Sequence, residues 1–261
     1  MERKTNYGNW IPITILRICY GVSALLILLF LLFLCCWPCL WAEVITAILA
    51  VASLVVSAFM HYCRYIFSFN GGGLMGEIHQ FLIDHLEWKG DGTLLDIGCG
   101  AAALTNRCAK HYPKAALTGI DYWGIGWNYA KEQCEKNAEI EGVADRVTFQ
   151  KGDAAKLDFE DETFDAAVSN FVFHEVRSQS DKREVVREAF RVIKKGGSFA
   201  FQDLFGSCSL YGDMTQFIEI LHNEGISEIH YIPHVERQPF ISRRPALSLM
   251  LRNMGLIYGR K

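Results

Sequence analysis

The chain has few of the features that mark flexible linkers, nucleic-acid-binding surfaces or disulfide frameworks. Only six of its 261 residues are proline and no Ser/Gly-rich linker occurs, so we expect one large domain with an appendage. The net charge of −3 provides no basic field, which excludes nucleic acid as an expected partner. The nine cysteines are scattered rather than regularly spaced. This pattern indicates reduced thiols in a cytosolic compartment.

Formal charge is also missing from two long stretches near the start of the chain. Between Arg17 and Glu43 lie 25 uncharged residues, and between Glu43 and Arg64 lie another 20. Each is long enough for a helix to cross a hydrocarbon core of about 30 Å. We therefore predict that residues 1–68 form a membrane anchor with two transmembrane helices. A cleaved signal peptide is the alternative, but its apolar region usually has only about 7–15 residues and would not be followed by a second such run.

The basic residues around these stretches predict their orientation. Arg3, Lys4 and Arg17 precede the first stretch and Arg64 follows the second, whereas the connecting CCWPCLWAE contains no Lys or Arg. By the positive-inside rule, both ends of the hairpin face the cytoplasm. The rest of the chain is then expected to be cytoplasmic and held at the membrane by two spans.

From residue 69 onwards, strand-like and helix-like segments alternate. The helix-like segments lie at about 102–111, 126–141 and 181–194, and the strand-like runs are Thr93–Gly98, Ala115–Asp121, Arg146–Gly152, Phe164–Asn170 and Ser198–Leu204. This alternation predicts an α/β domain over residues 69–261, with a Rossmann-like, doubly wound and mostly parallel sheet covered on both faces. The closing GLIYGRK is expected to form a last edge strand.

Polar residues end or closely follow each of the five predicted strands. In a parallel sheet, ligands bind beyond the carboxyl ends of the strands, so these residues are the candidate ligand-binding groups. Two glycines after the first strand, Gly98 and Gly100, would allow a sharp turn that brings backbone N–H groups close to a ligand. The strand-end residues are Asp96, Asp121, Asp153, Asn170 and Asp203.

The glycine turn fits more than one cofactor. The string GCGAAA from Gly98 to Ala103 satisfies the dinucleotide pattern G-x-G-x-x-G/A, and Asp121 follows at about the expected 20 residues, so an NAD(P)-dependent oxidoreductase is an alternative. However, Asp96 would direct a carboxylate toward the turn where a doubly negative pyrophosphate would lie, and like charges in a partly dry cleft repel strongly. A ligand with a cationic amino group at this place suits Asp96 better.

Several motifs together resemble the class I S-adenosylmethionine-dependent methyltransferases, particularly those that act on quinones and other small molecules. LLDIGCG resembles the first motif of that family, GIDYW the acidic end of its second strand, and GDA at 152–154 its adenine corner. FDAAVSNFVFHEV and REAFRVIKKGGSFAFQDLF resemble its fourth and fifth strand region. The resemblance covers residues 70–205 and implies S-adenosylmethionine as the cofactor.

The resemblance also implies roles for individual residues. Asp96, Gly98, Cys99 and Gly100 would surround the methionine part of the cofactor. Asp121 would hold the ribose diol, with Tyr122 and Trp123 flanking the adenosine. Asp153 and the amide of Ala154 would bind the adenine, and Asn170 would lie near the sulfonium. One departure is Ala102, since the family often has glycine there. As isolated residues, Asp121 and Asp153 could equally well terminate strands or cap turns.

Methyl transfer needs a base only if the acceptor loses a proton. His174, four residues after Asn170, is the candidate catalytic base because its ordinary pKa of about 6.5 suits that task, although a histidine there can also serve only to pack the loop. No metal-ligand cluster is evident. The expected acceptor is a small, hydrophobic or membrane-associated molecule such as a quinone, a lipid, or a lipophilic thiol or phenol. A non-catalytic, membrane-tethered S-adenosylmethionine-binding protein is a further alternative, and the oligomeric state is left open.

Overall fold

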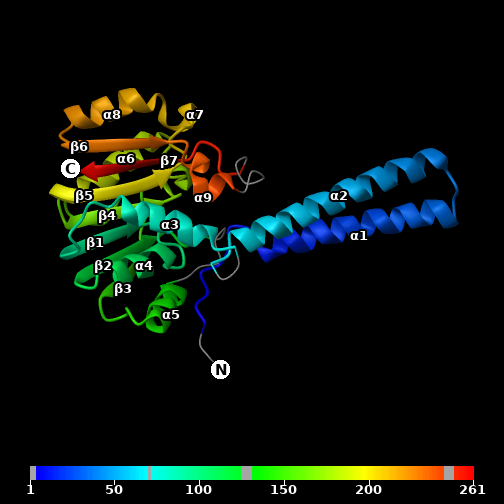
Figure 1. Ribbon diagram of the computed structural model, residues 1–261, viewed down its shortest axis with the longest axis horizontal. Helices are drawn as coiled ribbons and strands as arrows, with labels where there is room; N and C mark the ends of the chain where they lie inside the picture. The colour runs from blue at the N-terminus through cyan, green and yellow to red at the C-terminus, as the bar shows by residue number, and fades with distance from the viewer. Residues whose placement is uncertain (1–3, 70–71, 125–130, 244–249) are drawn as a thin grey trace. The chain divides into compact units, whose positions relative to one another are not determined.

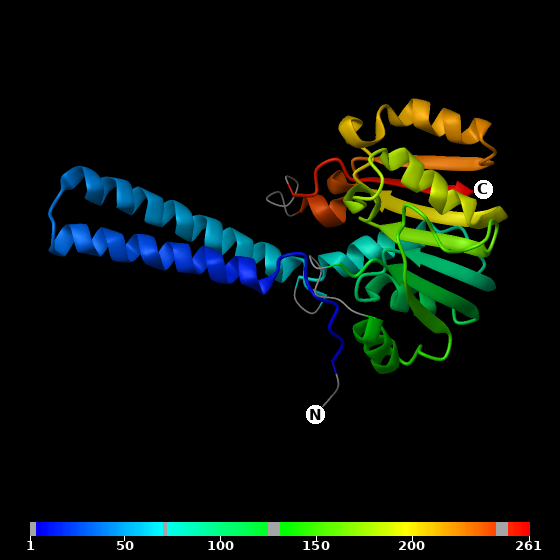
Figure 2. The ribbon, with the colours of Figure 1, turned by 180° about the vertical axis from the view of Figure 1, so that it is seen from behind.

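The structure is a computed structural model that describes residues 4–69, 72–124, 131–243 and 250–261. Contacts between Cα atoms divide the chain into two compact units. Gly8–Met75 forms a helical hairpin unit, and the rest of the described chain forms a second unit, called the sheet unit below (Figures 1 and 2). The predicted boundary after residue 68 lies close to this division. The assignment of the two parts as anchor and enzyme domain stays a prediction.

The hairpin unit consists of two long apolar helices, α1 (Ile13–Cys35) and α2 (Leu40–Ile66). At 1.5 Å per residue these helices are about 35 and 40 Å long, which exceeds a hydrocarbon core of about 30 Å. Their apolar side chains are largely exposed, and Leu28 and Val55 each expose 63% of their surface. Both helices are therefore long and apolar enough to cross a membrane, which is the property predicted from the uncharged stretches.

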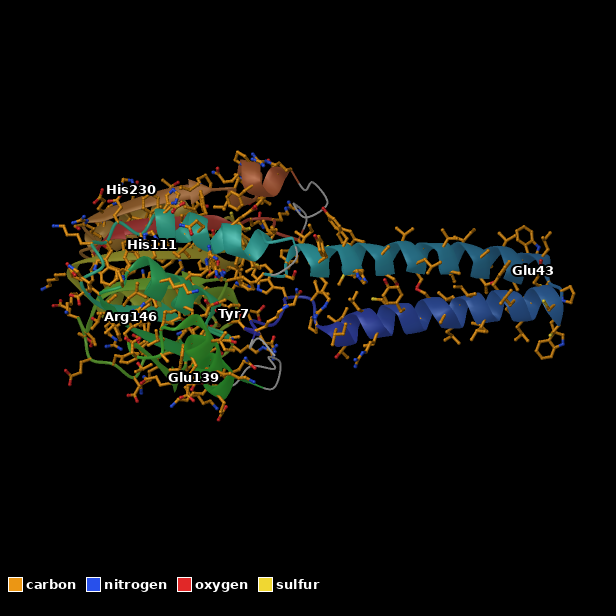
Figure 3. All side chains as sticks on the ribbon, turned by 60° about the horizontal axis from the view of Figure 1, so that its bottom comes forward. Tyr7, Glu43, His111, Glu139, Arg146 and His230 are labelled. Carbon is orange, nitrogen blue, oxygen red and sulfur yellow. The ribbon has the colours of Figure 1, made fainter. Side chains whose placement is uncertain are left out.

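Small polar side chains line the contact between the two helices of the hairpin. The Ser23 Oγ lies 2.7 Å from Ser53 Oγ and 3.0 Å from Ser57 Oγ, and both Ser23 and Ser57 are buried. Such side chains allow helices to approach closely and hydrogen-bond in an apolar medium. Glu43 lies at the connected end of the hairpin, where its carboxylate accepts a hydrogen bond from the Cys39 N–H at 3.1 Å (Figure 3).

The sheet unit contains seven strands in the order β3-β2-β1-β4-β5-β7-β6. The first five pair in parallel, and β7 runs antiparallel to both of its neighbours. This confirms the predicted Rossmann-like, mostly parallel fold. The strands are β1 (Gly92–Ile97), β2 (Ala115–Asp121), β3 (Val147–Lys151), β4 (Phe164–Asn170), β5 (Ile193–Asp203), β6 (Glu228–Pro233) and β7 (Gly255–Arg260).

Helices cover the sheet on both faces. The views in Figures 1 and 2 show α4 (Ala103–His111) on one face and α6 (Lys182–Arg191) on the other. The apolar run of β1 explains why both faces need cover, because Leu94, Leu95 and Ile97 are completely buried. The remaining helical segments are α3 (Leu74–Asp84), α5 (Lys131–Glu141), η1 (Phe173–Glu175), α7 (Cys208–Tyr211), α8 (Met214–Asn223), η2 (Val235–Arg237) and α9 (Pro239–Ser242).

The closing strand is not at the edge of the sheet, so that prediction is wrong. β7 lies between β5 and β6, and Leu256 and Ile257 are completely buried although they point to opposite faces. β6 forms the edge instead. None of its residues is buried, which fits a strand with only one neighbour. The apolar pair Leu256-Ile257 is the sequence signal that indicates an internal strand.

Two predicted boundaries also differ from the structure. The helix expected over 181–194 ends at Arg191, and β5 begins at Ile193 rather than at Ser198. The pairing shifts between these points, since Ile193 lies opposite Phe164 while Ser198 lies opposite Ala166. The residues between Ile193 and Ser198 form a bulge outside the hydrogen-bonded ladder of β4 and β5. Their sequence therefore predicts a loop. Residues 126–130 of the helix expected over 126–141 lie outside the described residues.

Candidate functional site

The strand-end residues predicted to bind a ligand come together at one edge of the sheet. Four of them lie at the carboxyl ends of the adjacent parallel strands β2, β1, β4 and β5. The register aligns these ends, because Asp96 is paired with Gly119 and Val168, and Asn170 with Gln202. Asp153 follows β3 by two residues. This edge is where ligands bind in open α/β sheets.

The glycine turn after β1 is built for close approach of the backbone. The N–H groups of Gly98 and Cys99 both donate to the Ile120 carbonyl oxygen at 2.8 Å, which ties the turn to β2. Gly98 has a φ of +76°, and a Cβ there would lie 2.1 Å from Val172 Cγ2. A side chain at this position would therefore push away the loop that follows β4. The turn and that loop thus form one packed structure.

Ala102, the departure from the family pattern, adopts the conformation that favours glycine. It precedes α4 with a φ of +68° and ψ of +26°, in the left-handed region. This conformation costs a residue with a Cβ about 1–2 kcal/mol. Ala102 is completely buried, and α4 begins immediately after it. Ala102 therefore adopts a backbone conformation that glycine would adopt without this cost.

Asp121 connects the end of β2 to the glycine turn. One carboxylate oxygen accepts a hydrogen bond from the Gly100 N–H at 2.9 Å, and the other accepts from the Trp123 N–H at 2.8 Å. The Trp123 indole in turn donates to the Gly100 carbonyl oxygen at 2.9 Å. Asp121 is only partly buried, so its carboxylate remains accessible to a ligand.

Asp96 lies behind the turn rather than at its surface. It is 1% exposed, and its Oδ2 accepts a hydrogen bond from the Thr105 hydroxyl at 2.5 Å. Burial, and to a smaller extent the charge of Asp121, raises the pKa of Asp96 to about 7 against the opposing effect of the Thr105 hydrogen bond. The carboxyl group is therefore mostly protonated below about pH 7 and mostly ionised above it. A cation placed beside it would favour the charged form.

Cys99, between the two glycines, is unsuited to nucleophilic chemistry. Its side chain is 6% exposed, and burial is the main reason why the pKa of its thiol is raised well above the ordinary value. The thiolate is the reactive form of cysteine. Cys99 therefore acts as a small space-filling residue in the turn.

Three of the residues predicted to surround the adenosine differ in accessibility. Tyr122 exposes 62% of its surface, and the Lys151 ammonium lies 5.2 Å from the centre of its ring. Asp153 is partly buried, and its Oδ1 accepts a hydrogen bond from the Ala155 N–H at 2.9 Å. Ala154 is buried. The Gly152 N–H donates to the Asp121 carbonyl oxygen at 3.0 Å, so the ends of β2 and β3 are joined.

The loop after β4 carries Asn170 and His174. The Asn170 Oδ1 accepts a hydrogen bond from Gln202 Nε2 at 2.8 Å, which fixes the side chain against β5. Phe173 is completely buried and anchors the loop, while His174 is partly exposed. His174 Nδ1 lies 2.8 Å from Oδ1 of Asp203, the last residue of β5. The predicted base therefore has a carboxylate partner.

Sequence reasoning named Asp203 as a strand-end residue but gave it no role in the site. Asp203 is completely buried, and its Oδ1 also accepts from the Tyr211 hydroxyl at 3.0 Å. Burial by itself would lower the pKa of His174, but the hydrogen bond and charge of Asp203 and the charge of Glu175 outweigh it and raise that pKa above its ordinary value. The signal that could have found this pair is the position of Asp203, at the end of the strand next to the one that precedes His174.

Asn137 of α5 is another residue that the sequence did not reveal. It is completely buried, and its Nδ2 donates to the Ala101 carbonyl oxygen at 2.9 Å. The same amide group pairs with the backbone of Asn6, accepting from its N–H at 2.9 Å and donating to its carbonyl oxygen at 2.8 Å. Tyr7, which follows Asn6 and is labelled in Figure 3, donates its hydroxyl hydrogen to Glu141 Oε1 at 2.7 Å. The start of the chain therefore supports the glycine turn through Asn137.

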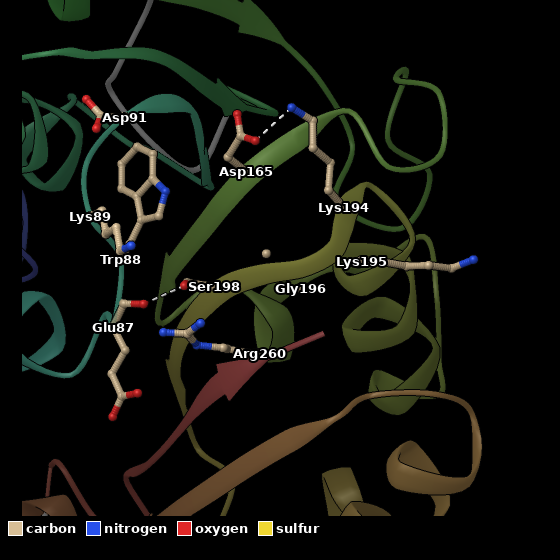
Figure 4. A pocket seen from close by; sticks show the side chains of 11 residues that line it. Glu87, Trp88, Lys89, Asp91, Asp165, Lys194, Lys195, Gly196, Ser198 and Arg260 are labelled. Carbon is tan, nitrogen blue, oxygen red and sulfur yellow. Dashed lines mark hydrogen bonds and ion pairs between the residues drawn. The ribbon is translucent and has the colours of Figure 1, made fainter.

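A separate cavity of about 310 Å³ lies at the opposite edge of the sheet (Figure 4). It is lined by residues at the amino ends of β1 and β4 and by Lys194, which forms an ion pair with Asp165 at 2.7 Å. None of the predicted site residues lines it. Because ligands of such sheets bind at the carboxyl ends of the strands, this cavity is not the candidate site.

Comparisons with known proteins show what this chain is similar to. Residues 95–201 match the model of a methyltransferase domain. The sterol 4-C-methyltransferase strm-1 of Caenorhabditis elegans is 30% identical over 164 residues, which cover 61% of this chain and 46% of that protein. The sterol 24-C-methyltransferase erg6 of Aspergillus fumigatus is 27% identical over 139 residues, which cover 53% of this chain and 35% of that protein. The chain thus spans less than half the length of these relatives.

Solved structures show the same fold. A geranyl diphosphate methyltransferase in complex with GPP and sinefungin superposes with a TM-score of 0.57 at 14% identity, covering 78% of this chain and 81% of that one. The [4+2]-cyclase SpnF superposes with a TM-score of 0.53 at 19% identity, covering 71% and 80%. The family match, the shared fold and the motif order lead to the same conclusion. Residues 95–201 are similar to a methyltransferase domain, and the sheet unit has the fold of the class I S-adenosylmethionine-dependent methyltransferases.

Proposed function

We propose that this protein transfers a methyl group from S-adenosylmethionine to a small hydrophobic acceptor held at the carboxyl edge of its sheet. The observation that carries the proposal is the arrangement around the glycine turn. There the buried carboxyl group of Asp96 precedes the turn near the end of β1, and the accessible carboxylate of Asp121 accepts a hydrogen bond from the Gly100 N–H within it. This arrangement suits a ligand that has both an amino group and a ribose diol.

The residues present fit such a cofactor. The backbone at Gly98 leaves no room for a Cβ, as expected where the backbone of a turn must approach a ligand closely. Asp96 would give up its proton to pair with the ammonium group, and Asp121 would accept hydrogen bonds from the ribose hydroxyls. Tyr122, Asp153 and the Ala154 amide would bind the adenine side, and Asn170 the sulfonium side.

When bound, S-adenosylmethionine supplies a methyl carbon already activated by positively charged sulfur. The protein must then align the acceptor with that carbon and keep water out. His174 would additionally take a proton from acceptors that must lose one. On this assignment, His174→Gln is expected to leave the cofactor affinity nearly unchanged and to lower turnover by roughly 10²–10⁴ with weakly acidic acceptors.

The expected acceptor class follows from the hairpin and from the names of the relatives. Two matched proteins are named for sterols and one structure for geranyl diphosphate. The hairpin has the length and composition to hold the sheet unit at a bilayer, where hydrophobic molecules concentrate. We therefore favour a membrane-partitioned acceptor of the sterol, isoprenoid or quinone type, with lipophilic thiols and phenols as further members of the class.

Two other functions are distinguished by experiment. An NAD(P)-dependent oxidoreductase would bind NADH, and a non-catalytic protein would bind S-adenosylmethionine without turnover. The [4+2]-cyclase among the structural matches illustrates that the fold alone does not fix the reaction. Calorimetric titration of the full-length protein in detergent should give binding of S-adenosylmethionine and S-adenosylhomocysteine and none of NADH. Binding of NADH alone would overturn the proposal.

A further inference from the structure

We propose that Asp203 and Tyr211 are positioning residues that orient His174 and fix which of its ring nitrogens accepts the acceptor's proton. The inference rests on the proposed methyl transfer and goes beyond it, because it requires that the acceptor release a proton during the reaction. Neither residue touches the reacting atoms in this assignment. Both act through the His174 ring.

Three donors converge on a single oxygen of Asp203. Oδ1 accepts from the Leu204 N–H at 2.6 Å and from the Tyr211 hydroxyl at 3.0 Å, and it faces His174 Nδ1 at 2.8 Å. The other oxygen, Oδ2, is buried without a hydrogen-bond partner among the described residues. The hydrogen-bond donors around the buried Asp203 carboxylate therefore reach only Oδ1. With so few donors, the hydrogen bond from the His174 ring is important for stabilising the carboxylate.

This geometry determines the tautomer of His174. An ionised carboxylate only accepts hydrogen bonds, so Nδ1 must carry the hydrogen that points at Asp203. In the neutral ring, Nε2 then presents its lone pair away from Asp203. Tyr211 is completely buried, and burial raises the pKa of its hydroxyl far above the ordinary value, so it remains a donor to Asp203 at any working pH.

The charged groups around His174 come from three elements. Asp203 belongs to β5, Glu175 is the next residue of η1, and Lys182 belongs to α6. Glu175 Oε1 lies 3.4 Å from Nε2 on a side chain that is 51% exposed. The Lys182 ammonium donates to the carbonyl oxygens of Val176 and Gln179, and its charge opposes protonation of His174. Asp203 is the only completely buried charge of the three.

The proton balance of the reaction follows directly. The acceptor atom loses one proton as it gains the methyl group, and Nε2 of His174 receives that proton. The resulting imidazolium is paired with the Asp203 carboxylate, which stabilises it. The proton leaves to solvent through the exposed side of the ring before the next turnover. Acceptors that fit are those with a hydroxyl, a thiol, or a carbon that sheds hydrogen on methylation.

The first test needs no acceptor. The full-length protein in detergent is treated with diethyl pyrocarbonate over pH 5.5–8.5, and acylation of the His174 peptide is quantified by mass spectrometry. We expect wild-type modification with a midpoint above the ordinary value of about 6.5, and a lower midpoint in Asp203→Asn, which keeps an acceptor oxygen but removes the charge. An unchanged midpoint in a folded Asp203→Asn protein would overturn the inference.

A matched control is provided by His230. Its Nε2 lies 2.8 Å from Glu228 Oε1, but both side chains are well exposed, at 47% and 44%. Glu228→Gln should leave the His174 midpoint where it is, because solvent screens the charge of the exposed Glu228. If Glu228→Gln moved the His174 midpoint as far as Asp203→Asn does, the effect would reflect general charge and the inference would fail.

A second measurement covers the case in which Asp203→Asn does not fold. The ¹⁵N chemical shifts of labelled histidine in the wild-type protein, with the His174 signals assigned by Tyr211→Phe and His174→Gln, should show a protonated Nδ1 and an unprotonated Nε2 at pH 8. A protonated Nε2 would overturn the inference. Failure of the proposed function would give a different result: His174 would keep this tautomer, but no acceptor would gain a methyl group.

With an acceptor in hand, the same variants separate positioning from structural support. Asp203→Asn should lower kcat with little change in KM and shift the neutral limb of the pH–rate profile to lower pH. Tyr211→Phe should lower kcat less, by about tenfold or below, because the Leu204 N–H still holds Asp203. A variant that raises KM and leaves kcat and the pH limb unchanged would contradict a positioning role.

Discussion

The carboxylate of Asp121 accepts a hydrogen bond from the Gly100 N–H at 2.9 Å, so the end of β2 holds the turn that follows β1. The two residues are 21 positions apart in the chain and come from neighbouring parallel strands. The same carboxylate is the proposed acceptor for the ribose diol. It therefore has two tasks, and a substitution there should affect both cofactor affinity and the shape of the turn.

We expect Asp121→Ala to weaken S-adenosylmethionine binding by about 1.5–3 kcal/mol, the usual contribution of hydrogen bonds to a charged group. Titration calorimetry of the folded variant measures this directly. Asp158→Ala is a suitable control, because Asp158 is exposed and follows β3 without being part of the site. Equal dissociation constants for wild type and Asp121→Ala would remove Asp121 from the cofactor site.

Gly98→Ala should destabilise the protein and abolish cofactor binding, since the added Cβ would meet Val172 at 2.1 Å. Gly142→Ala is a matched control for backbone strain. Gly142 has a φ of +70°, close to that of Gly98, but a Cβ there meets nothing within 4 Å. Left-handed strain alone should cost about 1–2 kcal/mol in both variants. Similar melting temperatures for the two would show that the contact with Val172 is unimportant.

Asp96 should make the stability of the ligand-free protein depend on pH. Its pKa is about 7 in the folded state, mainly through burial, and about 3.9 when unfolded, so the folded state holds the extra proton between these values. Stability should therefore fall as the pH rises from about 4 to about 7, and this group should contribute no further change above that. In Asp96→Asn this part of the dependence should disappear. Melting temperatures of both proteins over pH 4.5–8 measure it, and parallel curves would be the contrary result.

Cofactor affinity should show the opposite trend over the same range. Pairing Asp96 with the ammonium of S-adenosylmethionine requires loss of the proton, so the affinity should increase by up to about tenfold per pH unit between pH 5.5 and 7. Above about pH 8 the amino group itself loses its charge and the trend should end. Titrations at several pH values test this. An affinity independent of pH in the wild type would mean that Asp96 does not face the amino group.

The orientation of the hairpin is tested by reporter fusions. Fusions after Lys4 and after Lys261 should report a cytoplasmic location, and a reporter inserted near Pro38 should report the opposite side. The basis is the excess of basic residues outside the two stretches and their absence from the connecting segment. Termini on opposite sides would contradict the hairpin, and a cytoplasmic Pro38 would indicate helices that do not cross the membrane.

The sequence predicted those parts of the fold and site that depend on local pattern. Alternation of strand-like and helix-like segments predicted the parallel sheet, and the acids at or near the ends of β1, β2 and β3 indicated its candidate binding edge. The position of β7 was not predictable in this way. Whether a strand lies at an edge depends on which strand pairs with it, and the buried pair Leu256-Ile257 gave only an indirect signal.

Contacts between distant residues account for the rest. His174 could be named from its place after β4, but its pairing with Asp203 and Tyr211 depends on the register of β4 against β5 and on α7. The role of Asn137 depends on Asn6, which is 131 positions away. The high pKa of Asp96 likewise results from burial, which a sequence shows only indirectly. These contacts and this pKa determine the chemistry of the candidate site, and the spacing of residues in the sequence did not predict them.

The most direct test of the account is transfer of labelled methyl groups. The full-length protein in detergent is incubated with methyl-labelled S-adenosylmethionine and a total lipid and metabolite extract, and the organic and aqueous phases are then counted and analysed by mass spectrometry. We predict that label enters an organic-phase molecule with wild-type protein, and that it does so far more slowly with His174→Gln and not detectably with Gly98→Ala. Label confined to the unreacted cofactor with every extract, in a protein that binds S-adenosylmethionine, would contradict catalysis.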